Sequence, residues 1–183
     1  DISFPSSVKT IGDYAFEGCS SLESVKLPDN IEKIGKRVFK GCINLEKINL
    51  TVSNANYIID NDAIYEKNTN NLVTYTSGSK QKNFIIKDGV TEIDAQILLD
   101  CINTEIITLP ESLVDFKYNQ YNSLGMSECE NLKAINISDN NTLYRSIDGV
   151  LYSKDLSRLI VFPANKTDSY VISDKTVTIG EAA

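Results

Sequence analysis

The sequence predicts an α/β fold, a right-handed solenoid with a parallel β-sheet on its concave face and short helical turns on its convex face. Three observations predict it. A leucine-rich segment recurs every 23 residues, which suits one coil of a solenoid. Each such segment carries two apolar residues spaced two apart, as one inward-facing strand requires. A longer apolar segment recurs at an offset of 87 residues. Since a solenoid grows along one axis, the length of 183 residues sets the number of coils and not the size of a globular core.

The leucine-rich repeat reads Leu-x-x-Val-x-Leu over residues 22–27 and Leu-x-x-Ile-x-Leu over residues 45–50, and its frame returns at 104–109 and 132–137. We therefore expect seven short parallel strands, each with one inward pair of side chains. These pairs are Ile2/Phe4, Val25/Leu27, Ile48/Leu50, Phe84/Ile86, Ile107/Leu109, Ile135/Ile137 and Tyr170/Ile172.

Two segments that precede strands, residues 11–19 and 34–42, share the pattern Ile-Gly-x-x-Ala/Val-Phe-x-Gly-Cys. The spacing of their apolar residues predicts about one helical turn that buries one side and is bounded by glycines. Phe16 and Phe39 would then pack on the convex side of the solenoid.

Residues 62–75 match residues 149–162 at the offset of 87. Each segment contains two alternating apolar stretches around a polar turn, the pattern of a β-hairpin inserted in a long coil. We predict one array over residues 1–183, a fragment of a longer one because both ends fall inside a repeat. Its short coils cover about 8–53 and 90–140, and its hairpin-bearing coils about 54–89 and 141–175.

Four polar residues follow strands at the point where the backbone loses its sheet partners: Asn30, Ser53, Ser112 and Asn140. A buried amide or hydroxyl at this point would satisfy backbone groups from coil to coil. The alternative is that these side chains recognise a partner at the surface.

These residues resemble the BspA-like class of leucine-rich repeat proteins. Residues 11–31 are similar to that family's IGxxAFxxCxxLxxIxLPxxV unit, and residues 148–163 are similar to its DGVLYSKD…LIVFP element. The coil after Val90 departs from the pattern, since Asp94 and Asp100 replace its glycines. The resemblance implies a secreted or surface-anchored protein, mostly of bacteria, that adheres to other proteins or host tissue. It brings no catalytic motif.

Composition narrows the chemistry further. The absence of histidine excludes Ser-His-Asp, Cys-His and imidazole–zinc arrangements. A net charge of −7 without a basic stripe disfavours nucleic acid, and no apolar run approaches the roughly 20 residues that cross a bilayer. The acidic turns at 60–62 and 139–141 lack the glycine and distal glutamate of a calcium loop. We expect no catalytic, metal or cofactor residues, no direct membrane insertion, and a monomer.

The four cysteines, Cys19, Cys42, Cys101 and Cys129, occupy one position of the repeat and not the C-x-x-C spacing of a zinc site. Adjacent coils would bring them into pairs with Cα atoms roughly 5 Å apart. Buried thiols are favoured because stacked side chains point in parallel. Disulfides from coil to coil remain an alternative, and a reactive thiol a weaker one.

The outward residues of the strands form a row across the predicted sheet, and protein binding is predicted at four of them: Lys26, Asn49, Thr108 and Asn136. Simple solvated strands are the alternative. A second candidate is the insertion around 117–124, where Tyr118, Tyr121 and Asn122 combine rigid aromatic contact with adaptable hydrogen bonding. There the alternative is a loop that packs on itself or stays disordered.

The predicted function is a non-enzymatic protein–protein interaction or adhesion module of a secreted or cell-surface protein. Its partner would be a protein such as a host extracellular-matrix or surface protein. A signal and an anchor are expected outside this segment. The alternatives are a structural spacer in a cell-wall protein and the substrate-recognition region of a larger enzyme or secreted effector.

Overall fold

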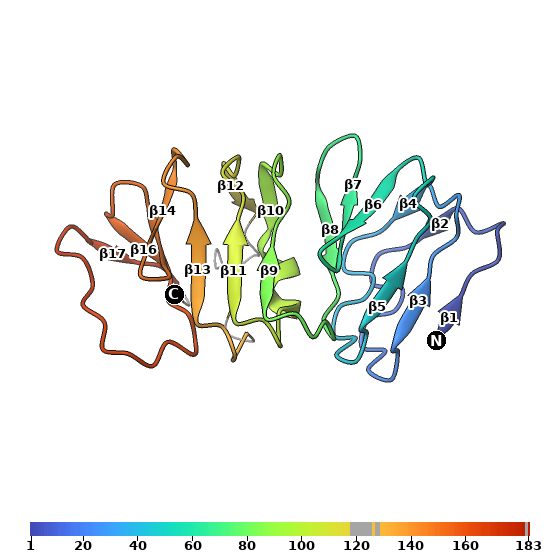
Figure 1. Ribbon diagram of the computed structural model, residues 1–183, viewed down its shortest axis with the longest axis horizontal. Coiled ribbons are helices and arrows are strands. Elements are labelled where there is room, and N and C mark those ends of the chain that lie inside the picture. Colours follow the sequence, from blue (N-terminus) through green and yellow to red (C-terminus); the bar gives the residue numbers. More distant parts are fainter. Residues whose placement is uncertain (118–125, 127–128, 182) are drawn as a thin grey trace. The chain divides into compact units, whose positions relative to one another are not determined.

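The computed structural model describes residues 1–117, 126, 129–181 and 183 (Figure 1). The contacts within the chain divide it into two compact units, Asp1–Lys80 and Gln81–Ala183. Each unit contains stacked coils with short parallel strands and is described by itself. That both belong to one continuous array stays a prediction.

Unit 1 follows the 23-residue repeat. Its parallel sheet pairs Ile2 with Val25 and Val25 with Ile48, so the predicted inward residues stack in register. A second parallel pair forms at Ile11 and Ile34, and three antiparallel strands follow. The strands are β1 (Ile2–Ser3), β3 (Ser24–Lys26) and β5 (Lys47–Asn49), then β2 (Thr10–Ile11) and β4 (Lys33–Ile34), and finally β6 (Tyr57–Asp60), β7 (Ala63–Glu66) and β8 (Leu72–Tyr75).

The core of unit 1 includes the phenylalanines that the sequence places behind the strands. The Phe16 and Phe39 rings stack with centroids 5.8 Å apart, and Phe4 meets Phe16 edge-on at 5.6 Å. The expected helical turn does not form in residues 13–18 or 36–41, which are hydrogen-bonded turns. Tyr14 and Arg37 adopt φ of 57° and 52°, a left-handed conformation that a right-handed helical turn does not allow.

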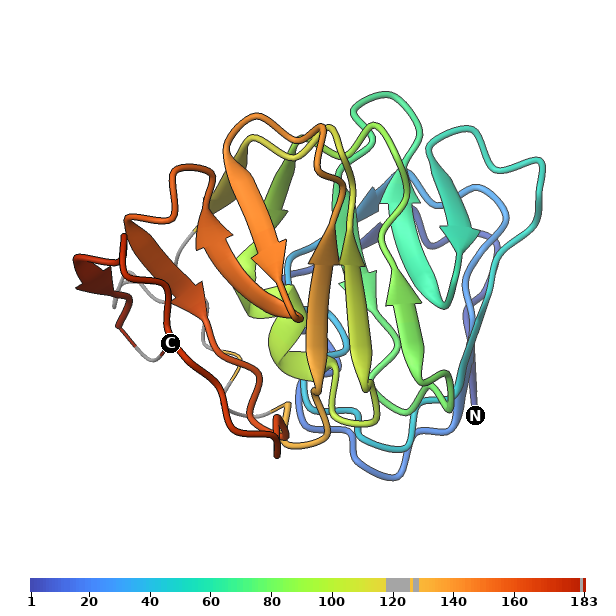
Figure 2. The same cartoon turned by 60° about the vertical axis from the view of Figure 1, so that its left-hand side comes forward.

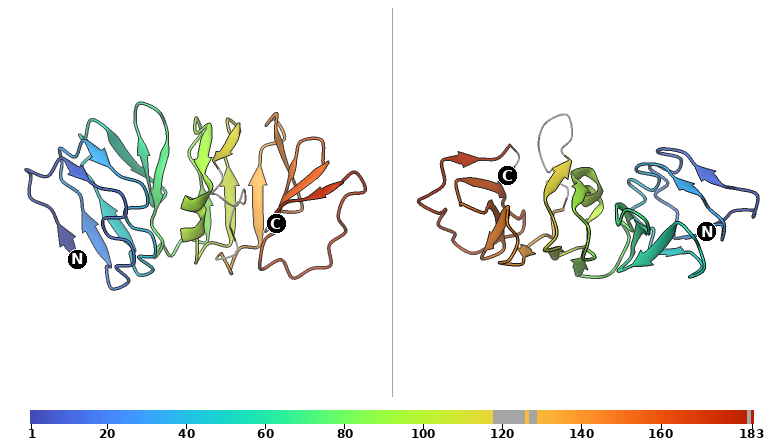
Figure 3. Two further views of the ribbon diagram at one scale, coloured as in Figure 1. Left: turned by 180° about the vertical axis from the view of Figure 1, so that it is seen from behind. Right: turned by 90° about the horizontal axis from the view of Figure 1, so that it is seen from above.

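Unit 2 repeats the pattern, with Phe84, Ile107 and Ile135 in register across a parallel sheet. The helix η1 (Ala95–Asp100) lies behind β9 in Figure 1 and in front of the strands in the rear view of Figure 3. The Asp94 carboxylate caps it by accepting a bond from the Gln96 N–H at 3.0 Å. The strands are β9 (Asn83–Ile85), β11 (Ile106–Leu109) and β13 (Ala134–Ile137), then β10 (Glu92–Asp94) and β12 (Asp115–Lys117), and finally β14 (Tyr144–Ile147), β15 (Val150–Ser153), β16 (Arg158–Val161) and β17 (Thr178–Ile179).

Each long coil contains three antiparallel strands, one more than the hairpin that the pattern predicts: β6–β8 in unit 1 and β14–β16 in unit 2 (Figure 2). The additional strand joins its neighbour through a two-residue turn. Asn61 and Asp62 have φ of 47° and 58°, and Asp148 and Gly149 have φ of 49° and 80°. Positive φ at both central residues is the requirement of a type I′ turn, which Asn, Asp and Gly meet best.

The seventh predicted strand, at Tyr170/Ile172, does not form. Residues 169–173 lack strand structure, and the Ile172 side chain is 41% exposed. This segment would pair with the free edge of β13. At that edge, the Ile135 N–H already donates to the Gly149 carbonyl at 2.8 Å, so it is not available for a further strand. Tyr170 instead packs edge-on against Phe162, with ring centroids 5.5 Å apart.

Polar side chains were expected to hydrogen-bond to the backbone of the turns at four positions. At two of these positions, the side chain that does so lies one residue later in the sequence. Asn30, Ser53 and Asn140 are exposed, whereas Asn54 and Asn141 are buried. The Asn54 amide donates to the Asp29 and Ile31 carbonyls and accepts from the Asn56 and Tyr57 N–H groups. Asn141 repeats this arrangement with Glu111, Leu113, Leu143 and Tyr144. Ser112 satisfies the backbone of a neighbouring coil as predicted, by donating to the Val90 carbonyl at 2.8 Å, whereas the Asn140 amide bonds to the Glu111 carboxylate.

All four cysteines are free thiols, as favoured, and three are buried. The Cys42 thiol donates to the Phe16 carbonyl at 3.1 Å and the Cys129 thiol to the Leu98 carbonyl at 2.9 Å. Burial raises the pKa of the Cys101 thiol. Cys19 is exposed, contrary to expectation.

These differences predict the reactivity of the thiols. In the native protein, a thiol reagent such as DTNB should modify Cys19 alone, because only its sulfur is accessible and burial opposes ionisation of Cys101. After unfolding in guanidinium, all four cysteines should react. A Cys19→Ser variant should show no rapid native reaction. Rapid modification of a second thiol in the native wild type would contradict the buried positions.

The turn between β15 and β16 predicts a pH dependence. The Asp155 carboxylate accepts bonds from the Ser153 hydroxyl at 2.7 Å and from the Ser157 N–H and hydroxyl at 3.0 and 2.8 Å. The Ser153 bond, followed by the two Ser157 bonds, lowers the pKa of Asp155 to about 2. Because the folded pKa is depressed, this stabilisation is complete above the ordinary value of about 4 and is lost as the pH falls toward 2.

We therefore expect Asp155→Asn to be less sensitive than the wild type to acidification from about pH 4 to about pH 2. The measurement is the urea midpoint of unfolding across this range. Asp174→Asn, in an exposed turn, is the matched control. Equal pH slopes for the wild type and Asp155→Asn would show that the turn does not stabilise the carboxylate.

Candidate binding surfaces

In unit 1, two of the predicted binding residues lie side by side. Lys26 on β3 and Asn49 on β5 are paired in register, and the Asn49 Nδ2 approaches the Val25 carbonyl at 3.5 Å. Both line a shallow hollow of about 210 Å³ at the C-terminal ends of the strands, together with Leu27, Asp29, Leu50 and Thr51. The hollow therefore combines an exposed cation with apolar carbon.

In unit 2, the other two predicted residues are also paired in register, Thr108 on β11 and Asn136 on β13. Asn136 is exposed and Thr108 is half-buried. Ile85 lies opposite Thr108 on β9 and is 51% exposed. The outward row thus presents a polar, partly apolar surface across three strands.

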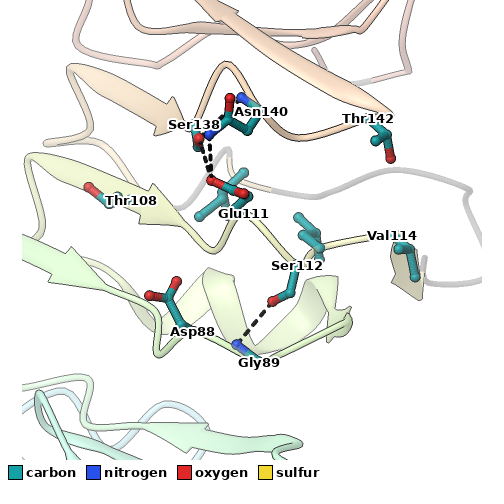
Figure 4. Close-up of a pocket in the computed structure, with 11 residues that line it drawn as sticks. Asp88, Gly89, Thr108, Glu111, Ser112, Val114, Ser138, Asn140 and Thr142 are labelled. Carbon is teal, nitrogen blue, oxygen red and sulfur yellow. Dashed lines mark hydrogen bonds between the residues drawn. The ribbon is translucent and has the colours of Figure 1, made fainter.

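Thr108 also lines a larger groove of about 880 Å³ at the C-terminal edge of this sheet (Figure 4). Its walls are the turns that follow β9, β11 and β13. The lining residues are Asp88, Gly89, Thr108, Leu109, Glu111, Ser112, Leu113, Val114, Ser138, Asn140 and Thr142. Asn136 is not among them.

Hydrogen bonds between coils hold the groove walls in place. The Glu111 carboxylate accepts from the Ser138 hydroxyl at 2.7 Å and from the Asn140 amide at 3.2 Å. The Ser112 hydroxyl accepts from the Gly89 N–H at 3.0 Å. The groove can therefore offer fixed carboxylate, hydroxyl and amide groups to a ligand.

Sequence reasoning identified Ser112 and Asn140 but missed the carboxylates of this groove. The available signal was the repeat register, because the groove residues Asp88 and Glu111, and Asp139 outside its lining, all follow the central residue of a strand by four positions. Three successive coils of unit 2 thus place a carboxylate at one position. Within the row, Asp139 pairs with Arg145 at 3.7 Å and Glu111 accepts bonds from Ser138 and Asn140 of the next coil.

At the opposite, N-terminal side of the same sheet, basic side chains are paired. Glu105 lies 2.7 Å from the Lys133 ammonium and 3.4 Å from that of Lys82. The Lys133 hydrogen bond and charge lower the pKa of Glu105, with a smaller effect of Lys82. At this edge Lys82 and Lys133 are therefore engaged by Glu105, whereas at the other edge Asp139 pairs with Arg145 at 3.7 Å and the groove carboxylates are Asp88 and Glu111.

The second candidate surface, Tyr118, Tyr121 and Asn122, lies outside the described residues. The description of β12 ends at Lys117, whose ammonium pairs with Glu92. The binding role of the insertion stays a prediction.

In the described part of the chain, no group of three His, Cys, Asp or Glu side chains is arranged to hold a metal ion. No helix among the same residues combines the length and the apolar character needed to traverse a bilayer.

Comparisons with known proteins place this geometry in a wider group. A leucine-rich cell surface protein from Faecalibacterium prausnitzii has a crystal structure similar to 78% of this chain, with 26% identity and a TM-score of 0.61. A leucine-rich repeat protein from Eubacterium ventriosum is similar in fold over 97% of this chain, with 21% identity and a TM-score of 0.58. The chain spans 36% and 42% of these two proteins, respectively. No curated protein sequence matches it.

The family assignment comes from the sequence itself. The family model described as the BspA type leucine rich repeat region matches six copies, over residues 1–80 and 74–176. These matches cover almost the whole chain and include the coils of both units. The chain therefore belongs to the BspA-type leucine-rich repeat family.

Proposed function

We propose that the chain is a non-enzymatic protein-interaction module of a secreted or cell-surface protein that serves in adhesion. The observation that carries the proposal is the position of the predicted binding row. In unit 1, Lys26 and Asn49 line a hollow at the C-terminal end of the parallel sheet, and in unit 2 Thr108 lines another. The right-handed winding and the concave position of the sheet are part of the proposal.

The backbone at these surfaces supports binding because it is already ordered. The Leu27 N–H donates to the Asn49 carbonyl and the Ile86 N–H to the Thr108 carbonyl, both at 2.9 Å. A partner that docks on hydrogen-bonded strands causes little loss of backbone entropy. The cell-surface location is supported by the similarity to the Faecalibacterium prausnitzii protein, which is described as a leucine-rich cell surface protein.

The test is binding of the purified chain to immobilised extracellular-matrix and bacterial-surface proteins, measured by surface plasmon resonance. We expect saturable binding to at least one of them. Combined Lys26→Ala and Asn49→Ala, or Thr108→Ala and Asn136→Ala, should weaken it about tenfold, because a few central contacts dominate an interface. Lys36→Ala and Glu130→Ala, at exposed positions away from the row, are the controls. If no protein binds saturably, the proposal is wrong and a spacer role is favoured.

A further inference from the structure

We propose that the groove at the C-terminal edge of the β9–β11–β13 sheet binds a basic peptide segment of a protein partner. The inference rests on the proposed function and names the chemistry of its partner.

The size of the groove suits several residues of a peptide. At about 880 Å³ it lies near the upper end of ligand sites and is much larger than one side chain requires. Its lining includes the apolar Val114 side chain, which is 48% exposed, whereas the lining leucines Leu109 and Leu113 are buried. The methylene stems of lysine and arginine could cover this apolar surface while their charged ends reach the carboxylates.

The charge of the groove selects a cation. Asp88 and Glu111 are exposed carboxylates on neighbouring coils, and the lining contains no lysine or arginine. Within the described part of the chain, neither carboxylate belongs to an ion pair. Glu111 is oriented by the Ser138 hydroxyl and the Asn140 amide, so its position is set before a ligand arrives (Figure 4).

Other partners fit the groove less well. Two carboxylates repel the phosphates of nucleic acids and of anionic lipid surfaces. A neutral saccharide would have no aromatic face to stack on, since none of the lining residues is aromatic. A basic peptide uses the carboxylates, the hydroxyls of Thr108, Ser112 and Ser138, and the apolar carbon together.

The experiment uses a fluorescein-labelled peptide of alternating lysine and alanine, titrated with the purified chain and followed by fluorescence anisotropy at low salt. We expect binding that weakens as salt is added. The double variant Asp88→Asn, Glu111→Gln should bind about tenfold more weakly, since two partly exposed charge contacts are removed. Both substitutions keep the shape of the side chain, and thermal melting should confirm that the fold is unchanged.

The matched control is Glu130→Gln, Asp174→Asn, which changes the net charge of unit 2 equally at exposed positions outside the groove. It should bind the peptide as tightly as the wild type. Three results would each overturn the inference. In the first, the groove variant binds the peptide as tightly as the wild type does. In the second, the control loses as much affinity as the groove variant, and in the third, a glutamate–alanine peptide binds as tightly as the basic peptide. Displacement of the peptide by maltohexaose would overturn it in favour of a saccharide.

The two proposals can fail separately. If immobilised proteins bind the chain and the groove variant retains this binding, the basic-peptide inference fails while the proposed function stands. If the peptide binds the groove but no protein is captured, the proposed function fails.

Discussion

Asn141→Ala is expected to lower the free energy of unfolding by about 3 kcal/mol, because it leaves buried backbone groups without partners. The Asn141 amide donates to the Glu111 and Leu113 carbonyls at 2.8 and 2.7 Å. Its oxygen accepts from the Leu143 and Tyr144 N–H groups at 2.9 and 2.7 Å. The side chain is 1% exposed, so water cannot replace these bonds without local opening.

The neighbouring residue supplies the control for this measurement. Asn140 is exposed, and its amide bonds to the Glu111 carboxylate at the surface. Asn140→Ala should therefore cost no more than about 0.5 kcal/mol. Urea unfolding, followed by circular dichroism, measures both variants. Similar losses for the two would show that the buried amide has no special role.

Gly35→Ala is expected to destabilise the protein by about 3 kcal/mol, because the added methyl group would overlap the backbone of the preceding coil. A Cβ at Gly35 would lie 2.4 Å from the Asp13 nitrogen and 2.5 Å from the Gly12 carbonyl carbon. Neither backbone can move freely, since the Gly35 N–H donates to the Ile11 carbonyl at 2.9 Å and the Lys36 N–H to the Asp13 carboxylate at 2.8 Å.

Gly12 occupies the same repeat position one coil earlier and is the matched control. A Cβ at Gly12 would meet no atom within 4 Å. Gly12→Ala should change the stability by less than about 0.5 kcal/mol. Differential scanning calorimetry of the two variants tests the difference. A large loss in Gly12→Ala, or none in Gly35→Ala, would mean that coil-to-coil contact is not the reason for glycine here.

The strands could be predicted from the sequence because their signal is local. Six of the seven predicted apolar pairs lie at or beside parallel strands, with Val25, Phe84 and Ile107 among the buried residues. The pair at Tyr170 and Ile172 has the same pattern, yet no strand forms. Whether a strand forms there depends on free backbone groups at the edge of the neighbouring strand. The apolar pattern of the segment gives no information about that edge.

The turns were harder to predict because their hydrogen bonds depend on position to within one residue. Ser53 and Asn54, like Asn140 and Asn141, are both suited to a turn, and composition does not say which one points inward. The offset of 87 residues relates Asn54 to Asn141 and could have identified them. The groove required the structure, since its walls come from three turns that are separate in the sequence.

The pairing of β9, β11 and β13 has an evolutionary consequence. Phe84 and Ile107 are 23 residues apart and Ile107 and Ile135 are 28 apart, yet both pairs are in register. The five additional residues (28 − 23) are therefore accommodated between the strands, where a change in length does not reverse the inward and outward side chains. Insertions and deletions in these connections can thus be tolerated without changing which side chains of the strands face outward.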